Sequence, residues 1–179
     1  QTGEVTPEVV GQIVDVQSTV NALLEADAHS TVDLVTVMVL PSITRAHFEP
    51  IYRGPATEPR VALMINVDWG GEYIPGMLEV LEENDITATF FPTGRWVQRS
   101  SDLAKTIAQA GHEVGNHGGW HGLASEMSRT ETARLIQEGE ELILQAIGQR
   151  TQLFAPPAGD FNKETVAVAA ELGYKTVLW

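Results

Sequence analysis

Two histidines near the middle of the chain are the residues whose types and spacing best suit chemistry. His117 and His121 lie four positions apart in the stretch Gly115–His121, with two glycines between them. Neutral imidazole is a common ligand for divalent metals, and a closely spaced pair can supply two ligands. Many such pairs are ordinary surface residues, so the spacing alone is a weak signal. Whether this pair binds a metal depends on what the neighbouring elements bring to it.

The elements around the histidines alternate between short apolar runs and helical patterns. Pro75 opens one helix, Ser128 and Glu131 form a capping-box pattern before another, and Gly111 and Gly173 end two more. This alternation predicts βαβ units around a parallel sheet, which is either a barrel or a doubly wound sheet. The predicted strands are 61–67, 86–91, one beginning at 113–114, 152–155 and 175–178, and the predicted helices are 75–84, 101–110, 128–148 and 162–172.

Polar or turn-forming residues directly follow four of the predicted strands. They are Asp68, Pro92–Gly94, His117 and Pro156–Pro157. In both kinds of parallel fold, ligands bind at the carboxyl ends of the strands, so these residues are expected on one face. Their convergence indicates a functional site that includes the histidine pair.

The first third of the chain follows a different pattern. Thr6–Ala26 has apolar residues at helical spacing, and Thr31–Leu40 is rich in β-branched residues, so the sequence predicts a helix and then a strand. Prolines and a glycine between 41 and 59 indicate a connector, with a boundary near Pro55. We therefore expect an N-terminal α+β extension over residues 1–55 and a main domain over 56–179. Because that domain ends on a bare strand, we also expect the native chain to continue past Trp179.

Charge and composition restrict the partners of the chain. With 24 acidic and 11 basic residues, the 179-residue chain has a formal net charge of -13, which argues against nucleic acid or an anionic membrane as partner. It contains no cysteine, which excludes disulfides, thiolate nucleophiles and cysteine-bound zinc. No apolar run approaches the roughly 20 residues that a membrane span needs. Neither the cellular location nor the oligomeric state can be read from the residues themselves.

Several segments stand in the order typical of a known family. They are Arg60–Leu63, Tyr73–Pro75, Thr87–Phe91, Gly111–His117, His121 and Pro156–Gly159. Together they resemble the polysaccharide deacetylases of carbohydrate esterase family four, the NodB-homology domain, over about Pro50 to Trp179. The likeness is greatest to the sporulation-associated subgroup, in which Asn-Val-x-Trp-Gly, here Asn66–Gly70, replaces an Asp-Asp-Gly motif.

The resemblance implies a fold, an activity and a cofactor. The fold would be a distorted, incomplete (β/α) barrel, and the reaction would be hydrolysis of N-acetyl groups on chitin-like or peptidoglycan sugars in the cell envelope or outside the cell. In this family an aspartate and two histidines hold a divalent ion, most simply zinc, with cobalt or nickel as alternatives. The ion polarises the acetamide carbonyl and activates water. By resemblance, His117 and His121 take the two histidine positions.

The first motif departs from the family pattern. Counting forward from Arg60 places Asn66 at the catalytic-base position and Val67 at the metal aspartate. Counting back from Tyr73 instead places Asp68 at the base and Trp69 at the ligand. Either way one carboxylate remains where the family has two, so Asp68 is expected to act as the base or as a third ligand.

The surroundings of the site show further departures and candidates. Ala155 stands where the family usually has an arginine before Pro-Pro. Glu72 is an alternative carboxylate ligand, while His112 is interpreted as structural and Asp160 as a helix cap. Aromatic rings pack well against sugars, so Trp69, Trp96 and Trp120, which fall in predicted loops, are candidates for glycan binding or for packing, and Pro156 and Pro157 are expected to shape the substrate loop.

Two hypotheses follow from these residues. One is an active, metal-dependent deacetylase with an altered site, and the other is a catalytically reduced relative that keeps the fold to bind peptidoglycan or another glycan. Only the first requires tight metal binding and turnover.

Overall fold

The structure, a computed structural model, describes residues 11–28, 30–39, 41–55, 57 and 59–179. The chain divides into two compact units, Gln1–Arg45 and Ala46–Trp179.

The N-terminal unit contains one antiparallel strand pair and one helix. Strand β1 (Gly11–Val14) pairs with β2 (Thr36–Val39), and helix α1 (Val16–Glu25) lies between them in the sequence. The prediction of a single helix over Thr6–Ala26 is wrong for 11–14, and residues 6–10 lie outside the described part. The helix begins only after Asp15, whose carboxylate caps it by accepting a hydrogen bond from the Ser18 amide at 3.0 Å.

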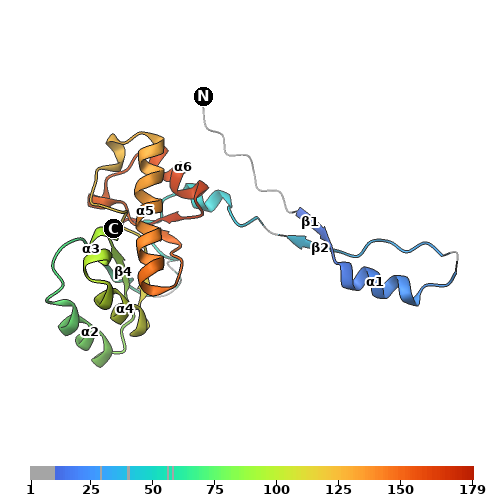
Figure 1. The fold of residues 1–179 in the computed structure, drawn as a ribbon, viewed down its shortest axis with the longest axis horizontal. Helices are drawn as coiled ribbons and strands as arrows, with labels where there is room; N and C mark the ends of the chain where they lie inside the picture. The colour runs from blue at the N-terminus through green and yellow to red at the C-terminus, as the bar shows by residue number, and fades with distance from the viewer. Residues whose placement is uncertain (1–10, 29, 40, 56, 58) are drawn as a thin grey trace. The chain divides into compact units, whose positions relative to one another are not determined.

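The second unit alternates strands and helices, as predicted (Figure 1). Among the α-helices and strands of the described residues, α3, which follows β4 after one residue, is the addition to the predicted order. Its strands and α-helices are β3 (Met64–Val67), α2 (Ile74–Glu83), β4 (Thr89–Pro92), α3 (Gly94–Arg99), α4 (Ser101–Gln109), β5 (Glu113–Val114), α5 (Arg129–Ile147), β6 (Leu153–Phe154), α6 (Lys163–Glu171) and β7 (Lys175–Thr176). Three single turns of 3-10 helix span Arg45–Phe48, Ala124–Glu126 and Pro157–Gly159.

The strands of this unit are parallel and lie in sequential order. Strand β4 pairs with β3 and with β5, and β6 pairs with β7. A parallel bridge between Asn116 and Phe154 joins the two groups, and another between Ile51 and Val177 extends the far edge. The predicted parallel sheet is therefore confirmed, and within the described residues it is open rather than closed into a barrel.

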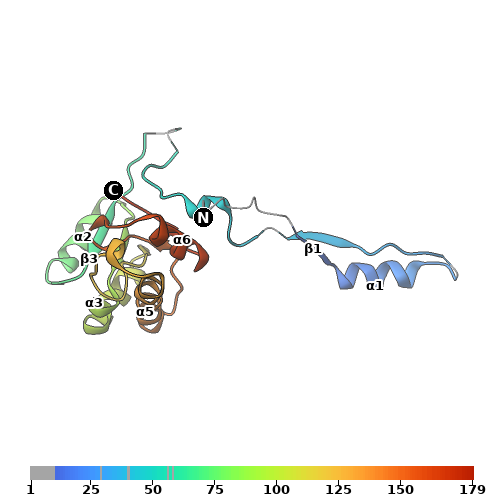
Figure 2. The same cartoon turned by 90° about the horizontal axis from the view of Figure 1, so that it is seen from above.

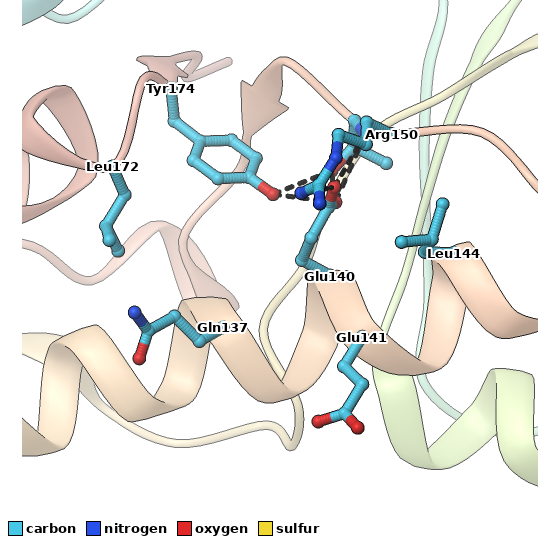
Figure 3. A pocket seen from close by; sticks show the side chains of 8 residues that line it. Gln137, Glu140, Glu141, Leu144, Arg150, Leu172 and Tyr174 are labelled. Atoms are coloured by element: carbon cyan, nitrogen blue, oxygen red, sulfur yellow. Dashed lines mark hydrogen bonds and ion pairs between the residues drawn. The ribbon is translucent and has the colours of Figure 1, made fainter.

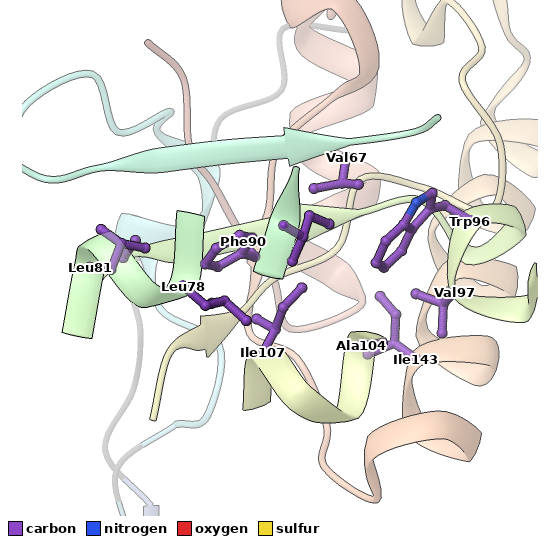
Figure 4. Packing of buried hydrophobic residues seen from close by; sticks show 11 residues of the cluster. Val67, Leu78, Leu81, Phe90, Trp96, Val97, Ala104, Ile107 and Ile143 are labelled. Carbon is purple, nitrogen blue, oxygen red and sulfur yellow. The ribbon is translucent and has the colours of Figure 1, made fainter. Parts of the chain in front are cut away.

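The helices bury their apolar faces in two clusters. Figure 4 shows the first, in which Val67 and Phe90 from the sheet pack against side chains of α2, α3, α4 and α5. The second joins α5 and α6 around Phe154. Sequential parallel strands with right-handed crossovers place successive helices on the same side of a sheet, and helices α2, α3, α5 and α6 are seen in Figure 2 around the strands.

Two features of the predicted elements are clarified by this packing. Trp96 lies in α3 with 1% of its surface exposed, so it is a core residue and the expectation of a loop position is wrong. The capping box predicted at Ser128 and Glu131 is present, and α5 ends at Gly148 with a left-handed φ of 73°. None of the helices in the described part of the chain is long and apolar enough to cross a membrane.

Candidate functional site

The carboxyl ends of adjacent strands bring the predicted site residues into one row. The Thr93 amide donates to the carbonyl oxygen of Val67 at 2.8 Å, and the His117 amide donates to that of Pro92 at 3.1 Å. On the other side, the Ala155 amide donates to the carbonyl oxygen of Asn116 at 3.0 Å. Residues that follow each strand are therefore held side by side by backbone hydrogen bonds, as parallel pairing requires.

His117 is buried and oriented by the backbone. Only 2% of its surface is exposed, and its Nδ1 lies 2.6 Å from the carbonyl oxygen of Ala155. Because a carbonyl can only accept, Nδ1 carries the proton and Nε2 keeps its lone pair. Burial lowers the pKa of His117 to about 4, so the ring is neutral near neutral pH. A neutral ring fixed through its second nitrogen is the usual state of a metal-binding histidine.

His121 lies beside His117 and is exposed. The ring centroids are 5.5 Å apart, with an angle of 66° between the ring planes. A zinc–nitrogen bond of about 2 Å places a ring centroid roughly 3 Å from the ion, so two tetrahedral ligands have centroids about 5 Å apart. The spacing of the pair is compatible with a shared ion. Trp69, which is 79% exposed, also lies near His121, with ring centroids 6.4 Å apart.

Asp68 is held beside this pair by its neighbours. Its Oδ1 accepts a hydrogen bond from the Thr93 hydroxyl at 2.8 Å, and its backbone oxygen accepts one from Arg99 at 3.2 Å. Its charge acts on His117 by raising that pKa slightly against the effect of burial. Glu72, the alternative carboxylate, is exposed and accepts a hydrogen bond from the Gly71 amide at 2.9 Å.

Whether a catalytic metal fits here depends on how many metal-binding side chains the site brings together. A catalytic zinc needs three protein ligands and an open position. No three His, Cys, Asp or Glu side chains come together in a metal-binding group within the described residues. The geometry thus supports two of the three ligands, and Asp68 as the third stays a prediction.

The two other positions of the first motif do not add a carboxylate. Val67 is 6% exposed and its side chain lies in the hydrophobic cluster of Figure 4. Asn66, its neighbour in β3, is exposed, and successive side chains of a strand point to opposite faces. An amide does not accept a proton near neutral pH, so neither residue replaces a general base.

The Pro156–Pro157 loop is rigid and buried. Both prolines are buried, and the turn that follows includes Ala158 at φ 57°. Asp160 does not cap α6, which is a correction to the sequence interpretation, because Asn162 caps that helix. Asp160 instead accepts hydrogen bonds from the backbone amide and hydroxyl of Ser125, at 2.7 and 2.8 Å, and so connects the proline loop to the 3-10 turn at Ala124–Glu126.

His112 has the structural role predicted for it. It is buried, its Nδ1 accepts a hydrogen bond from the Ala88 amide at 3.3 Å, and its ring packs against Phe90.

A buried polar network behind His117 was not anticipated from the sequence. The Asn116 side chain accepts a hydrogen bond from the Gly118 amide at 2.7 Å and donates to the carbonyl oxygen of Ile136 at 2.9 Å. It also donates to the Tyr174 hydroxyl at 3.3 Å, and that hydroxyl donates to Glu140 at 2.7 Å. The loop that carries both histidines is thereby fixed to α5 and to the start of β7.

Tyr174 and Glu140 also line a surface pocket (Figure 3). Its other lining residues are Gln137, Glu141, Leu144, Arg150, Thr151 and Leu172. None of these is a predicted site residue, so the pocket is distinct from the histidine pair. Burial raises the pKa of Tyr174 to about 12, which keeps the hydroxyl protonated and able to donate to Glu140.

Trp120 is contacted by two arginines rather than standing free. The guanidinium carbons of Arg95 and Arg134 lie 5.7 and 5.2 Å from the centre of its ring. Trp120 itself is partly buried and packs against the second hydrophobic cluster.

Known proteins that resemble this chain include enzymes and one pseudoenzyme. The uncharacterised Bacillus subtilis protein YlxY is 42% identical over 149 residues, which cover 82% of this chain and 47% of YlxY. A peptidoglycan-N-acetylglucosamine deacetylase of Bacillus cereus is 34% identical over 125 residues, covering 70% of this chain and 58% of the enzyme. The chain spans about half the length of the curated relatives it matches.

Solved structures agree with these relatives. The structure of BA3943 from Bacillus anthracis, a CE4 family pseudoenzyme, matches with a TM-score of 0.73 at 35% identity and covers 100% of this chain and 64% of that one. The Bacillus subtilis family-four carbohydrate esterase PdaA matches with a TM-score of 0.70 at 27% identity, over 74% of this chain and 57% of PdaA. The sequence model of polysaccharide deacetylases matches residues 53–177. On these grounds the chain belongs to the polysaccharide deacetylase family.

Proposed function

We propose that this chain is a catalytically reduced polysaccharide deacetylase domain that binds acetylated peptidoglycan or a chitin-like glycan beside His117 and His121. The observation that carries the proposal is the ligand set. Two imidazoles lie side by side, but no three His, Cys, Asp or Glu side chains of the described residues form a group that could hold a metal. The glycan is expected to bind along the row formed by Asp68, Trp69 and the Pro156–Pro157 loop.

The chemistry of deacetylation explains why this ligand set argues against efficient turnover. Hydrolysis of an acetamide needs a polarised carbonyl, a water of lowered pKa and a base that accepts the water's proton. Two histidines would hold zinc weakly, and Asn66 is not a base. Asp68 is the one carboxylate left in the first motif, and the Thr93 hydroxyl already donates to one of its oxygens.

The relatives support the same reading. BA3943, whose match spans all of this chain and 64% of its own, is a pseudoenzyme. A BA3943 mutant with restored enzymatic activity matches this chain with a TM-score of 0.73 at 34% identity. For this chain we propose that side chains at the site account for the reduced activity, because Asn66, Val67 and Ala155 depart from the family motifs.

Metal-dependent deacetylation is the second candidate, and the orientation of His117 favours it. Its Nε2 is unprotonated and its ring is neutral, which suits binding of zinc, cobalt or nickel. In this case Asp68 would complete the ligand set or act as base. The first candidate predicts glycan binding without acetate release, whereas the second predicts acetate release that disappears in the His121→Ala variant and on chelation.

Several finer assignments belong to the same proposal. We infer an incomplete (β/α) barrel from the sequential parallel order, in which β3 and β7 lie toward opposite edges of an open sheet. We also propose an N-terminal extension over residues 1–55, membership of the sporulation-associated subgroup and a location at the cell envelope or outside the cell. These follow from the motifs quoted above and from the peptidoglycan substrates named for relatives.

The binding proposal is tested with matched aromatic variants. Trp69 is 79% exposed beside His121, and Tyr52 is 60% exposed and serves as the control. Calorimetric titration of chitotetraose should show binding that Trp69→Ala weakens about tenfold, since an aromatic–sugar contact is worth about 1 to 1.5 kcal/mol. Tyr52→Ala should bind like the wild type. Equal affinities for wild type and Trp69→Ala would reject this binding face.

A further inference from the structure

We propose that Glu140 of α5 is a positioning residue for the histidine pair, acting through Tyr174 and Asn116 on the loop that carries both rings. We call residues 116–121 the histidine loop. Glu140 lines the pocket of Figure 3, and no sequence pattern pointed to it. Its effect on glycan binding rests on the proposed function, whereas its effect on the loop can be measured without a ligand.

Three hydrogen bonds connect the histidine loop to Glu140, and all of them point the same way. The Gly118 amide, which lies between the two histidines, donates to Oδ1 of Asn116 at 2.7 Å. Nδ2 of Asn116 donates to the Tyr174 hydroxyl at 3.3 Å, and that hydroxyl donates to Oε2 of Glu140 at 2.7 Å. Asn116 is 0% exposed and Tyr174 is 5% exposed, so water competes little for the bonds between them.

Glu140 sets this direction because its carboxylate is surrounded by donors. The Thr151 amide donates to it at 3.1 Å and the Thr151 hydroxyl at 2.5 Å, while Arg150 forms an ion pair with it at 3.6 Å. The Thr151 hydroxyl also lies 2.9 Å from that of Tyr174, but its own proton is directed to Glu140. A carboxylate is the stronger acceptor, so the Tyr174 proton points to it as well and leaves the oxygen lone pairs for Asn116.

The direction matters because the Asn116 amide has one orientation that satisfies its neighbours. Its Oδ1 faces the Gly118 amide, and its Nδ2 faces the carbonyl oxygen of Ile136 at 2.9 Å. If Tyr174 donated toward Asn116 instead, two donors would face each other. Turning the Asn116 amide over would place its NH2 group against the Gly118 amide, which is also a donor. Either change leaves a buried donor without an acceptor, which is costly.

The segment held by these bonds has little conformational preference of its own. Gly118 adopts a left-handed φ of 84°, and a second glycine, Gly119, follows it. The neighbouring bonds are made by backbone groups, since the Gly119 amide donates to the carbonyl oxygen of Leu135 at 2.6 Å and the Gly94 amide donates to that of Gly118 at 2.8 Å. The Asn116 side chain holds the Gly118 amide itself, so we expect the spacing of the two imidazoles to depend on this bond.

Native-state hydrogen exchange, followed by NMR, tests the hold on the loop. Glu140→Gln keeps the size of the side chain, but its NH2 group can donate to the Tyr174 hydroxyl, whose proton is then free to turn toward Asn116. The Gly118 amide should exchange about tenfold faster relative to the slowest amides of α4, which is the effect of losing one hydrogen bond. A residue that only stabilised the fold would speed both kinds of amide alike. Glu141→Gln, which removes the same charge from an exposed position in the same pocket, should keep the wild-type ratio.

Two further variants separate this link from general destabilisation. Tyr174→Phe removes the hydroxyl that connects Glu140 to Asn116 and should lower the protection of the Gly118 amide by a similar factor. When Tyr174→Phe and Glu140→Gln are combined, the second substitution should add little, because both act on one chain of hydrogen bonds. Glu140→Asp, which keeps the carboxylate on a shorter side chain, should restore part of the protection. Folding of each variant is checked by its circular dichroism spectrum and unfolding midpoint.

Calorimetric titration of chitotetraose connects the loop to binding. Glu140→Gln should bind about threefold more weakly than the wild type, because the binding-competent loop is then populated for only part of the time, and Glu141→Gln should bind like the wild type. An exchange ratio that Glu140→Gln leaves unchanged would overturn the positioning role, and a changed ratio with unchanged affinity would confine Glu140 to a structural one. Failure of the folded wild-type protein to bind chitotetraose would overturn the proposed function, while the exchange rates would still decide whether Glu140 holds the loop.

Discussion

Gly139 of α5 is the position at which a single added methyl group should disturb the histidine loop most directly. A Cβ at this position would lie 2.3 Å from Oδ1 of Asn116 and 2.7 Å from the carbonyl carbon of Gly118. Both atoms belong to the segment that carries His117. Gly118 is backbone and cannot rotate away, and moving the Asn116 side chain would break its hydrogen bonds to the Gly118 amide and the Ile136 carbonyl.

The expected cost of Gly139→Ala follows from these contacts. Overpacking in a rigid core costs about 1 to 3 kcal/mol. Loss of one buried hydrogen bond of Asn116 adds about 1 kcal/mol. Alanine in a helix interior stabilises the folded state by about 1 kcal/mol relative to glycine, which offsets part of this cost. The net effect is a loss of about 2 kcal/mol of unfolding free energy, which corresponds to a lower melting temperature by roughly 4 to 8 °C for a chain of this size.

Gly76 in α2 provides the matched control. It is also a helical glycine, but a Cβ there meets nothing within 4 Å. Gly76→Ala should therefore stabilise the protein by about 0.5 kcal/mol through helix propensity alone. Urea unfolding followed by circular dichroism measures both variants. If Gly139→Ala proved as stable as Gly76→Ala, the close approach of α5 to the histidine loop would be refuted.

Three further predictions concern titration and metal binding. Burial raises the pKa of Tyr174 to about 12 from an ordinary 10. The contribution of this group to the free energy of unfolding should therefore be fully present below pH 10 and decline between pH 10 and 12. In urea unfolding, Tyr174→Phe should flatten this decline. Burial lowers the pKa of His117 to about 4 from 6.5. The contribution of this group to the free energy of unfolding should therefore be fully present above pH 6.5 and decline as the pH falls toward 4. A carbon-detected NMR titration in which His117 titrated near 6.5 would contradict the buried, neutral ring. Zinc titration by calorimetry should give weak binding that His121→Ala abolishes, whereas tight binding that Asp68→Asn weakens would establish Asp68 as a third ligand.

Much of the second unit could be predicted because its signals are local. The Ser128 and Glu131 capping box and the glycine at 148 each act within a few residues, and the structure has them as expected. The apolar runs predicted the order of the strands but not their bounds, since the run at 61–67 is a strand only over Met64–Val67 and Val61 is 86% exposed. Helix α3 was missed because it spans six residues, starts with a glycine and is stabilised by Trp96 in the core. The strand at Gly11–Val14 was mistaken for helix because short apolar runs fit both periods, and pairing with β2 decides between them.

The features of the site also divide into those that local sequence predicts and those that it does not. His117 and His121 share one short loop, so their proximity follows from spacing, and the structure has the rings side by side. The Asn116–Tyr174–Glu140 network joins residues far apart in the sequence, and no local pattern indicates such pairs. The stacking of Arg95 on Trp120 is hidden for the same reason, since it depends on how α3 meets the histidine loop.

Acetate release is the measurement that tests the central claim most directly. Purified protein, supplied with excess zinc and with N-acetylglucosamine and N-acetylmuramic acid oligomers, is assayed by mass spectrometry for the loss of 42 Da per deacetylated sugar, roughly the mass of one acetyl group exchanged for hydrogen. We expect oligomers that bind but stay fully acetylated. Repeated turnover that is lost in both His117→Ala and His121→Ala, and on adding a chelator, would show that two imidazoles and Asp68 suffice for catalysis and would contradict the account.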